Sequence, residues 1–130
     1  LGLHALEHGV TDAPEGLVQA HLRPRPKLTE GMLLASLGGV TAMIDVSDGL
    51  VQDLGHIAER SGVSIDISLE KLPLTREQEE YAARSGLSAV EAALSGGEDY
   101  ELAFTVLPGR ATDVLRQFRE QFMLPVAVIG

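Results

Sequence analysis

A buried strand that runs straight into an amphipathic helix constrains this fold more than any other part of the sequence. Residues 41–46 (TAMIDV) are apolar and β-branched, which predicts a buried strand. Residues 49–60 then repeat apolar side chains at helical spacing. The apolar stripe comprises Leu50, Leu54, Ile57 and Ala58, and the face predicted to meet water comprises Gln52, Asp53, His56, Glu59 and Arg60. Only Ser47 and Asp48 separate the two elements, so we expect a tight corner with one of these residues as the N-cap of the helix.

Helical and strand patterns alternate along the rest of the chain. Helices are predicted at residues 1–9, 14–21, 29–38, 75–85, 88–94 and 111–122, with Thr29 as the N-cap of the third. Alternating apolar residues predict further strands at residues 63–69, 100–106 and 125–129, and the middle one should bury Tyr100. The pattern favours an α+β class in which a mixed central sheet is covered by helices. A length of 130 residues suits a single domain, residues 1–130.

The composition narrows the partners that the chain can have. Apolar residues make up 45% of it, which is enough for a core, and the net charge is −9. Such a chain repels nucleic acid and anionic membranes, and it repels a nucleotide phosphate unless cations lie between them. No apolar run approaches the ~20 residues that span a bilayer, and the absence of cysteine fits a cytoplasmic protein. We therefore expect no nucleic-acid partner and no membrane, and we expect metal ions to hold any phosphate.

The corner at residues 45–49 (DVSDG) places two carboxylates where a strand ends and a helix begins. Anionic ligands bind at such corners in α/β proteins, and paired carboxylates suit Mg²⁺, which bridges them to phosphate oxygens. The Ser47 hydroxyl and nearby amides could hold a phosphate directly, and Gly49 would let it approach. Spacing alone favours an ordinary helix cap instead. A calcium loop is excluded, because the glycine and glutamate positions that it requires hold Leu50 and His56.

A second acidic segment lies at residues 95–101 (SGGEDYE). Gly96 and Gly97 permit close approach of the backbone. The carboxylates of Glu98, Asp99 and Glu101 follow at once, and crowding them costs free energy unless cations or hydrogen-bond donors compensate. The alternative is a hairpin-like loop with solvated acids.

A possible zinc motif and several missing motifs also bear on function. Residues 4–8 (HALEH) match the inverted zinc-protease pattern, but no third protein ligand can be assigned, so a solvated helix face is favoured. The lysine-containing phosphate loop, the dinucleotide-binding glycine motif and the nucleophile elbow are all absent from the chain. A nucleotide site here would therefore depend on metal ions.

Two segments together carry a family resemblance: MIDVSDGLVQDLGHIAERSGVSIDISLEKLPL and ALSGGEDYELAFTV, which span about Met43 to Val106. They closely resemble the C-terminal domain of thiamine-monophosphate kinases. SDGL followed by DLGHIA is shared more loosely with aminoimidazole ribonucleotide synthetases, selenophosphate synthetases and hydrogenase-maturation factors, whereas GGEDYEL points to the thiamine enzymes. The resemblance implies transfer of the γ-phosphoryl group of ATP to thiamine monophosphate, with Mg²⁺, with K⁺ as a further cation, and in a homodimer.

The resemblance also implies roles for single residues. By position in the motifs, Asp45 and Asp48 would be Mg²⁺ ligands, and Ser47 would contact ATP. Glu98 would contact the thiamine substrate. Supporting roles fall to Gly49, Asp53, Gly96, Gly97, Asp99 and Glu101.

The chain also departs from the whole enzyme that it resembles. The family's N-terminal domain supplies much of the ATP site and dimer interface and carries a GDDA-like metal motif, and no such run occurs here. We therefore expect residues 1–130 to be the C-terminal domain of a longer kinase, inactive by itself. Two alternatives remain open: a sister ATP-dependent enzyme of the aminoimidazole ribonucleotide or selenophosphate synthetase type, and a non-catalytic acidic scaffold domain.

Overall fold

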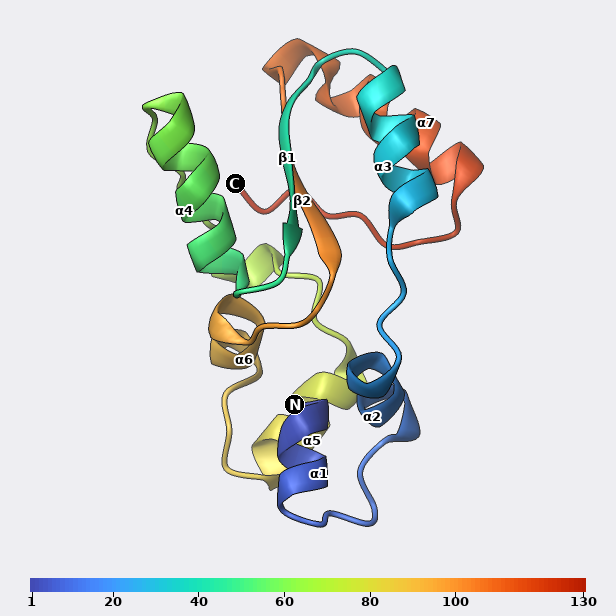
Figure 1. Ribbon diagram of the computed structural model, residues 1–130, viewed down its shortest axis with the longest axis vertical. Helices are drawn as coiled ribbons and strands as arrows, with labels where there is room; N and C mark the ends of the chain where they lie inside the picture. The colour runs from blue at the N-terminus through green and yellow to red at the C-terminus, as the bar shows by residue number, and fades with distance from the viewer.

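The computed structural model describes residues 1–130, and its elements are helices with a small sheet (Figure 1). The helices are α1 (Gly2–Glu7), α2 (Glu15–Leu22), α3 (Leu28–Ser36), α4 (Leu50–Ser61), α5 (Arg76–Arg84), α6 (Ala89–Ser95) and α7 (Ala111–Gln121). The strands are β1 (Val40–Val46) and β2 (Glu101–Val106), and short 3₁₀ turns occupy η1 (Leu69–Lys71) and η2 (Pro108–Arg110). Every predicted helix forms, and the α+β class is confirmed. No helix is both long and apolar enough to cross a membrane.

The sheet determines which distant segments meet. Strands β1 and β2 pair antiparallel, with Asp45 opposite Leu102 and Val46 opposite Glu101. Because the strands run in opposite directions, the end of β1 lies beside the start of β2. The two acidic segments of the sequence are therefore neighbours in space.

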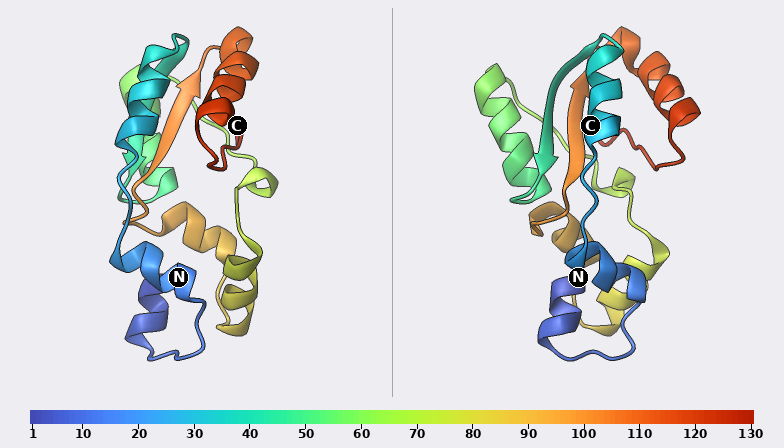
Figure 2. Two further views of the ribbon diagram at one scale, coloured as in Figure 1. Left: turned by 90° about the vertical axis from the view of Figure 1, so that its right-hand side faces the viewer. Right: turned by 45° about the vertical axis from the view of Figure 1, so that its right-hand side comes forward.

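Helices cover both faces of this sheet, as the right panel of Figure 2 shows, with α4 on one side and α3 and α7 on the other. The cluster against α4 has Val46, Leu54, Ile57 and Ala103 at its centre. The cluster against α3 and α7 has Leu34, Val114 and Phe118 at its centre. In β2 the side chains alternate between the two clusters, with Ala103 on the α4 side and Leu102 and Phe104 on the other, because successive side chains of a strand point to opposite faces. Strand β1 contributes mainly to the α4 cluster, through Ile44 and Val46.

Helices α1, α2 and α5 form a separate group at the opposite end of the molecule from α7 (Figures 1 and 2). Tyr81 of α5 is 1% exposed, and its hydroxyl lies 3.0 Å from Nδ1 of His4 on α1. The backbone of Gly2 packs so closely on Leu17 that a side chain at residue 2 would meet the Leu17 carbonyl. A capping box between Thr75 and Gln78 fixes the start of α5.

Two predicted strands do not form. Residues 63–69 and 125–129 are irregular apart from the start of η1 at Leu69, and the single backbone hydrogen bond between them joins Ser68 N to Ile129 O at 2.6 Å. One bond does not make a ladder, although Ile65, Ile67 and Ile129 still pack against the α4 cluster. The apolar alternation therefore predicted the partial burial of Ile65 and Ile67 correctly, but Val63 and Leu69 are exposed and the predicted strand pairing is wrong.

The predicted cap of α3 is also wrong. The helix begins at Leu28, with Lys27 at the N-cap position and no side-chain cap hydrogen bond. The Thr29 hydroxyl already lies inside the helix, where it donates to the Glu30 carboxylate at 2.9 Å. A hydrogen bond from the backbone of Glu30 is the largest cause that lowers the pKa of its carboxyl group, and the bond from Thr29 lowers it further.

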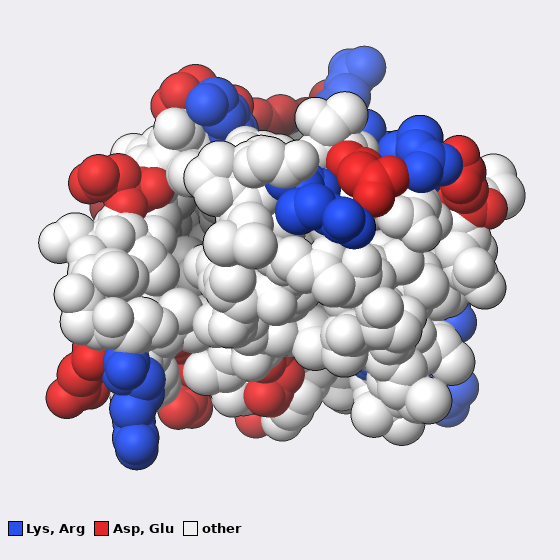
Figure 3. All heavy atoms as spheres, turned by 90° about the horizontal axis from the view of Figure 1, so that it is seen from above, with Lys and Arg blue, Asp and Glu red and all other residues white.

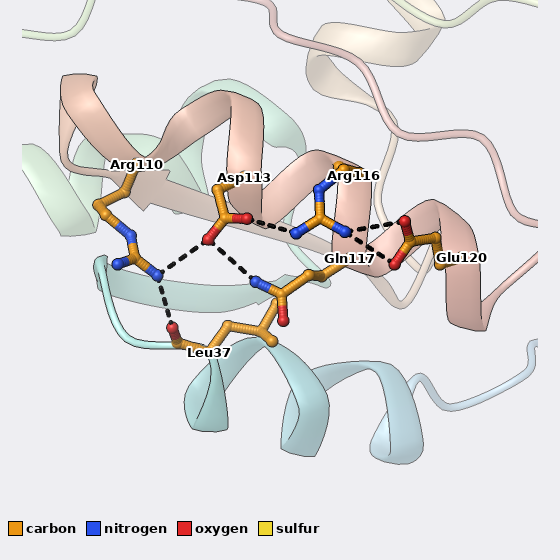
Figure 4. Close-up of polar contacts among 6 residues, drawn as sticks. All are labelled: Leu37, Arg110, Asp113, Arg116, Gln117 and Glu120. Carbon is orange, nitrogen blue, oxygen red and sulfur yellow. Dashed lines mark hydrogen bonds and ion pairs between the residues drawn. The ribbon is translucent and has the colours of Figure 1, made fainter.

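Polar contacts join α7 to the end of α3, as Figure 4 shows. Asp113 accepts hydrogen bonds from Arg110, Arg116 and Gln117, and Arg110 also donates to the Leu37 carbonyl at 3.1 Å. The hydrogen bond from Arg116 holds the pKa of Asp113 below its ordinary value. Viewed from this end, positive and negative side chains lie close together on a largely uncharged surface (Figure 3). The acidic excess of the chain is not concentrated on this face.

Candidate functional site

The two acidic segments are joined by backbone hydrogen bonds where β1 ends and β2 begins. Glu98 N donates to Ser47 O at 2.8 Å, and Tyr100 N donates to Val46 O at 2.8 Å. These bonds extend the strand pairing past the regular ladder. The structure thus brings together the corner at 45–49 and the loop at 95–101, which are about fifty positions apart in the sequence.

The loop makes these bonds in an unusual conformation. Glu98 has φ 67° and Tyr100 has φ 51°, so both lie in the left-handed region that side chains rarely adopt. Tyr100 is 38% exposed, and the prediction that its side chain is buried is wrong. A left-handed residue at the start of β2 breaks the strand alternation from which that burial was predicted.

Glycines allow the corner and the loop to touch. Gly49 is buried and has φ 114°, and a Cβ there would lie 3.2 Å from the Ser95 carbonyl. A Cβ at Gly97 would lie 2.7 Å from Ser47 O, and one at Gly96 would meet the Ala92 carbonyl. Gly49 is therefore needed for packing against the end of α6, a different reason from the ligand approach suggested by the sequence.

The corner is held from within by Asp53. This residue was predicted to face water, but it is only 2% exposed. Its Oδ2 atom accepts hydrogen bonds from Ser47 N at 2.9 Å and from Asp48 N at 3.0 Å. The N-cap position of α4 is Gly49, with no side-chain cap, so the prediction that Ser47 or Asp48 caps the helix is wrong. The available signal was an acidic residue in the first turn of α4, from which a carboxylate can reach back to preceding amides.

The acidic side chains of the site differ in their partners. Glu101 pairs with Lys27 Nζ at 2.9 Å, and Glu98 lies 3.7 Å from Nδ1 of His21. The Lys27 side chain is only 15% exposed, so it is largely packed against its neighbours. Asp45 and Asp48 are exposed, and neither side chain takes part in any of the hydrogen bonds or ion pairs within the chain. The expectation that cations compensate the crowded loop is met for Glu101, which pairs with Lys27.

Asp99 has a distinct electrostatic environment. Partial desolvation raises the pKa of its carboxyl group, and repulsion from the Glu101 carboxylate adds to the rise. The residue as a whole is nevertheless exposed, so solvent weakens the effect of this environment on stability.

The donor set at the corner fits part of a magnesium site. The chain contains no group of three or more His, Cys, Asp or Glu side chains placed to hold a metal ion. Mg²⁺, however, is commonly held by one or two carboxylates together with phosphate oxygens and water. The exposed carboxylates of Asp45 and Asp48 match that smaller requirement.

The zinc-like run at residues 4–8 is engaged in packing. The rings of His4 and His8 stack with centroids 4.2 Å apart, and His4 also contacts the Tyr81 hydroxyl. His8 Nδ1 lies 3.0 Å from the His4 carbonyl oxygen. The His4–Tyr81 contact joins α1 to α5, and the other two contacts lie within α1 and its C-terminal end.

Residues 2–130 match the family model described as "AIR synthase related protein, C-terminal domain". The chain is 46% identical to the thiamine-monophosphate kinase of Aquifex aeolicus (strain VF5) over 89 residues, which is 68% of this chain and 28% of that protein. It is 43% identical to the thiamine-monophosphate kinase of Haemophilus influenzae (strain ATCC 51907 / DSM 11121 / KW20 / Rd) over 114 residues, 88% of this chain and 33% of that protein. The chain thus spans about a third of the length of these curated relatives.

Solved structures agree with the sequence relatives. The thiamine-monophosphate kinase of Stenotrophomonas maltophilia K279a superposes with a TM-score of 0.86 at 36% identity, covering 99% of this chain and 42% of that one. AaThiL, complexed with AMPPCP and TMP, superposes with a TM-score of 0.75 at 40% identity, covering 84% of this chain and 36% of that one. The resemblance to thiamine-monophosphate kinases is confirmed, and the chain belongs to the family of AIR synthase related proteins, whose C-terminal domain it matches over residues 2–130.

Proposed function

We propose that residues 1–130 are the C-terminal domain of a thiamine-monophosphate kinase, which transfers the γ-phosphoryl group of ATP to thiamine monophosphate. The observation that carries this proposal is the junction between the DVSDG corner and the GGEDYE loop, made by Glu98 N to Ser47 O and Tyr100 N to Val46 O. Phosphoryl transfer depends mainly on positioning the two substrates and neutralising their charge. A junction that joins a candidate nucleotide segment to a candidate acceptor segment provides the positioning.

Asp45 and Asp48 would hold Mg²⁺ in this function. Their carboxylates are exposed and have no partner within the chain, and the net charge of −9 would otherwise oppose phosphate binding. Bound Mg²⁺ would supply positive charge that offsets both these carboxylates and the phosphate groups of the substrates. K⁺ is a further cation that the proposal includes.

Ser47 would contact ATP through its hydroxyl group. The backbone N–H groups of Ser47 and Asp48 already donate to Asp53, so these amides are not available to a phosphate. The corner thus resembles a metal-bridged phosphate site more than a loop of free amides. The start of α4 adds a favourable dipole for negative charge.

Glu98 would contact the thiamine substrate. Thiamine carries a positively charged thiazolium ring, for which a carboxylate is a suitable partner. The Glu98 side chain is 61% exposed, and Nδ1 of His21 lies 3.7 Å from its carboxylate. Its backbone bond to Ser47 holds it beside the segment proposed to bind the nucleotide.

The remaining parts of the proposal concern the longer protein. An N-terminal domain would supply the rest of the ATP site and the remaining metal ligands, and it would form much of a homodimer interface. The protein would be cytoplasmic. Residues 1–130 alone would then have no useful kinase activity, because the carboxylates they provide are only part of a metal site.

The test uses the full-length protein that contains this chain. It is incubated with ATP, Mg²⁺ and thiamine monophosphate, and thiamine diphosphate is measured for the wild type, Asp48→Ala and the matched control Asp66→Ala, which changes an exposed aspartate outside the site. We expect product from the wild type and the control and a loss of at least about a hundredfold for Asp48→Ala. Absence of product from the wild type would reject the proposal and favour a sister enzyme, which a panel of other acceptors would identify. Equal activity of all three proteins would reject the metal role of Asp48.

A further inference from the structure

We infer that Asp53 is the positioning residue of the proposed kinase site: its buried carboxylate fixes the Ser47–Asp48 backbone so that the Asp48 side chain is presented to metal and phosphate. This inference rests on the proposed function, and it gives a specific role to Asp53, for which the family resemblance implies only a supporting one. Its basis is one contact set, in which Asp53 Oδ2 accepts from Ser47 N at 2.9 Å and from Asp48 N at 3.0 Å.

The burial of Asp53 requires an explanation. It is the only charged residue among the buried side chains of the chain, at 2% exposed. A buried carboxylate is costly unless charged or hydrogen-bonding partners compensate it. Asp53 belongs to none of the ion pairs of the chain, and both hydrogen bonds of its side chain go to corner amides. The buried charge is therefore compensated by the two corner N–H groups, which can donate to it only in this conformation of the corner.

The backbone of residues 46–48 is also held by the loop at residues 95–101. The carbonyl groups of Val46 and Ser47 accept from the loop, while the N–H groups of Ser47 and Asp48 donate to Asp53. With its amides and carbonyls engaged, the segment has little freedom to rotate. Ser47 remains half-buried and Asp48 exposed, so their side chains are the groups left to meet a ligand.

Two substitutions separate positioning from a direct contact with metal. Asp53→Ala removes both hydrogen bonds, whereas Asp53→Asn retains an acceptor oxygen for the same amides and removes the charge. A positioning residue should be rescued largely by asparagine. A metal ligand should not be, because its charge is what the metal requires. Glu59→Gln is the matched control, since Glu59 is an exposed acid on the same helix.

The first readout is the Mg²⁺ dependence of the full-length kinase. We expect Asp53→Ala to raise the Mg²⁺ concentration for half-maximal activity and the KM for ATP by about tenfold or more, and Asp53→Asn by less than about threefold. The KM for thiamine monophosphate should change less than either. Equal impairment by alanine and asparagine, or equal increases in both KM values, would overturn the inference.

The second readout does not need activity. Amide hydrogen exchange of the peptide that contains Ser47 and Asp48 is followed by mass spectrometry in the full-length wild type and the three variants. We expect exchange about tenfold or more faster in Asp53→Ala, an intermediate rate in Asp53→Asn and the wild-type rate in Glu59→Gln. If Asp53→Ala does not fold, the exchange rate of Asp53→Asn is the test. A rate above that of the wild type supports the inference, and the wild-type rate overturns it.

The two readouts distinguish a failure of the proposed kinase function from a failure of the positioning role of Asp53. Wild-type protein that makes no thiamine diphosphate rejects the proposed function, and the exchange measurement still shows whether Asp53 fixes the corner. Unchanged exchange in folded Asp53→Ala rejects the positioning role even when the kinase is active.

Discussion

The corner at residues 45–49 and the loop at residues 95–101 meet at one junction but are stabilised in different ways. The corner is held by Asp53, a residue only a few positions further along the same chain segment. The loop depends on partners that are distant in the sequence. Its backbone bonds to the corner, Glu98 lies near His21, and Glu101 pairs with Lys27. The loop also contains two residues with left-handed backbone.

This difference indicates a division between support and recognition. The corner is fixed by a short-range, buried interaction, so it can serve as a rigid base. The loop adopts a strained conformation only because the surrounding structure compensates, which is typical of segments that contact ligands. If this division is correct, substitutions in the corner should reduce stability, whereas relief of strain in the loop should increase stability and reduce function.

The largest effect on stability is expected from Gly49→Ala. The residue has φ 114°, and a Cβ would lie 3.2 Å from the Ser95 carbonyl, so the corner or α6 must shift. We expect a loss of about 2–3 kcal/mol in the free energy of unfolding, measured by urea denaturation. The matched control is Gly55→Ala on the same helix, where a Cβ meets nothing within 4 Å and should increase stability by about 0.5–1 kcal/mol. Equal effects at the two positions would show that the corner is not tightly packed.

A smaller effect of opposite sign is expected from Glu98→Gly. Glycine adopts φ 67° without steric cost, so the folded protein should gain about 0.5–1 kcal/mol in unfolding experiments. The same change removes the carboxylate proposed to contact thiamine, so the KM for thiamine monophosphate in the full-length enzyme should rise. Glu101→Gly is the control, because Glu101 has ordinary backbone geometry in β2 and should lose stability. A loss of stability in Glu98→Gly would refute the strain assigned to the loop.

The smallest effect is expected from Asp99→Asn, and it depends on pH. Because the folded-state pKa of Asp99 is raised, the folded protein binds the proton more tightly, and stability falls as pH rises from the ordinary pKa through the raised one. Asparagine removes that loss, so it should add a few tenths of a kcal/mol at pH 7 and almost nothing below pH ~3.5. Thermal unfolding at the two pH values measures this difference. A gain of the same size at both would assign the effect to packing instead of charge.

The parts of the fold that depend on local chemistry could be predicted from the sequence. Thr75 with Gln78 and Ser88 with Glu91 form the starts of two helices, and each uses side chains within one turn. The apolar stripe of α4 was likewise readable, and Leu54 and Ile57 are buried as expected. Such features need no knowledge of the rest of the fold.

Features that depend on distant partners could not be predicted in this way. Residues 63–69 have strand-like alternation, but only a neighbouring strand could have made a ladder, and none is present. The antiparallel β1–β2 register that places Glu98 beside Ser47 is invisible to periodicity. Asp53 was assigned to the solvent face because helical spacing says nothing of the turn that precedes the helix. The roles of Asp45, Ser47, Asp48 and Glu98 remain predictions for the experiments above.

The bonds across the junction have a consequence for how such a domain can diverge. Both join main-chain atoms, Glu98 N to Ser47 O and Tyr100 N to Val46 O. Main-chain bonds of this kind do not depend on the identity of the side chains at either end, apart from the conformations that those side chains permit. Mutation can therefore exchange the side chains of the loop while its attachment to the corner persists. A lineage built on this junction can acquire new acceptor preferences without rebuilding the segment that would bind the phosphate donor.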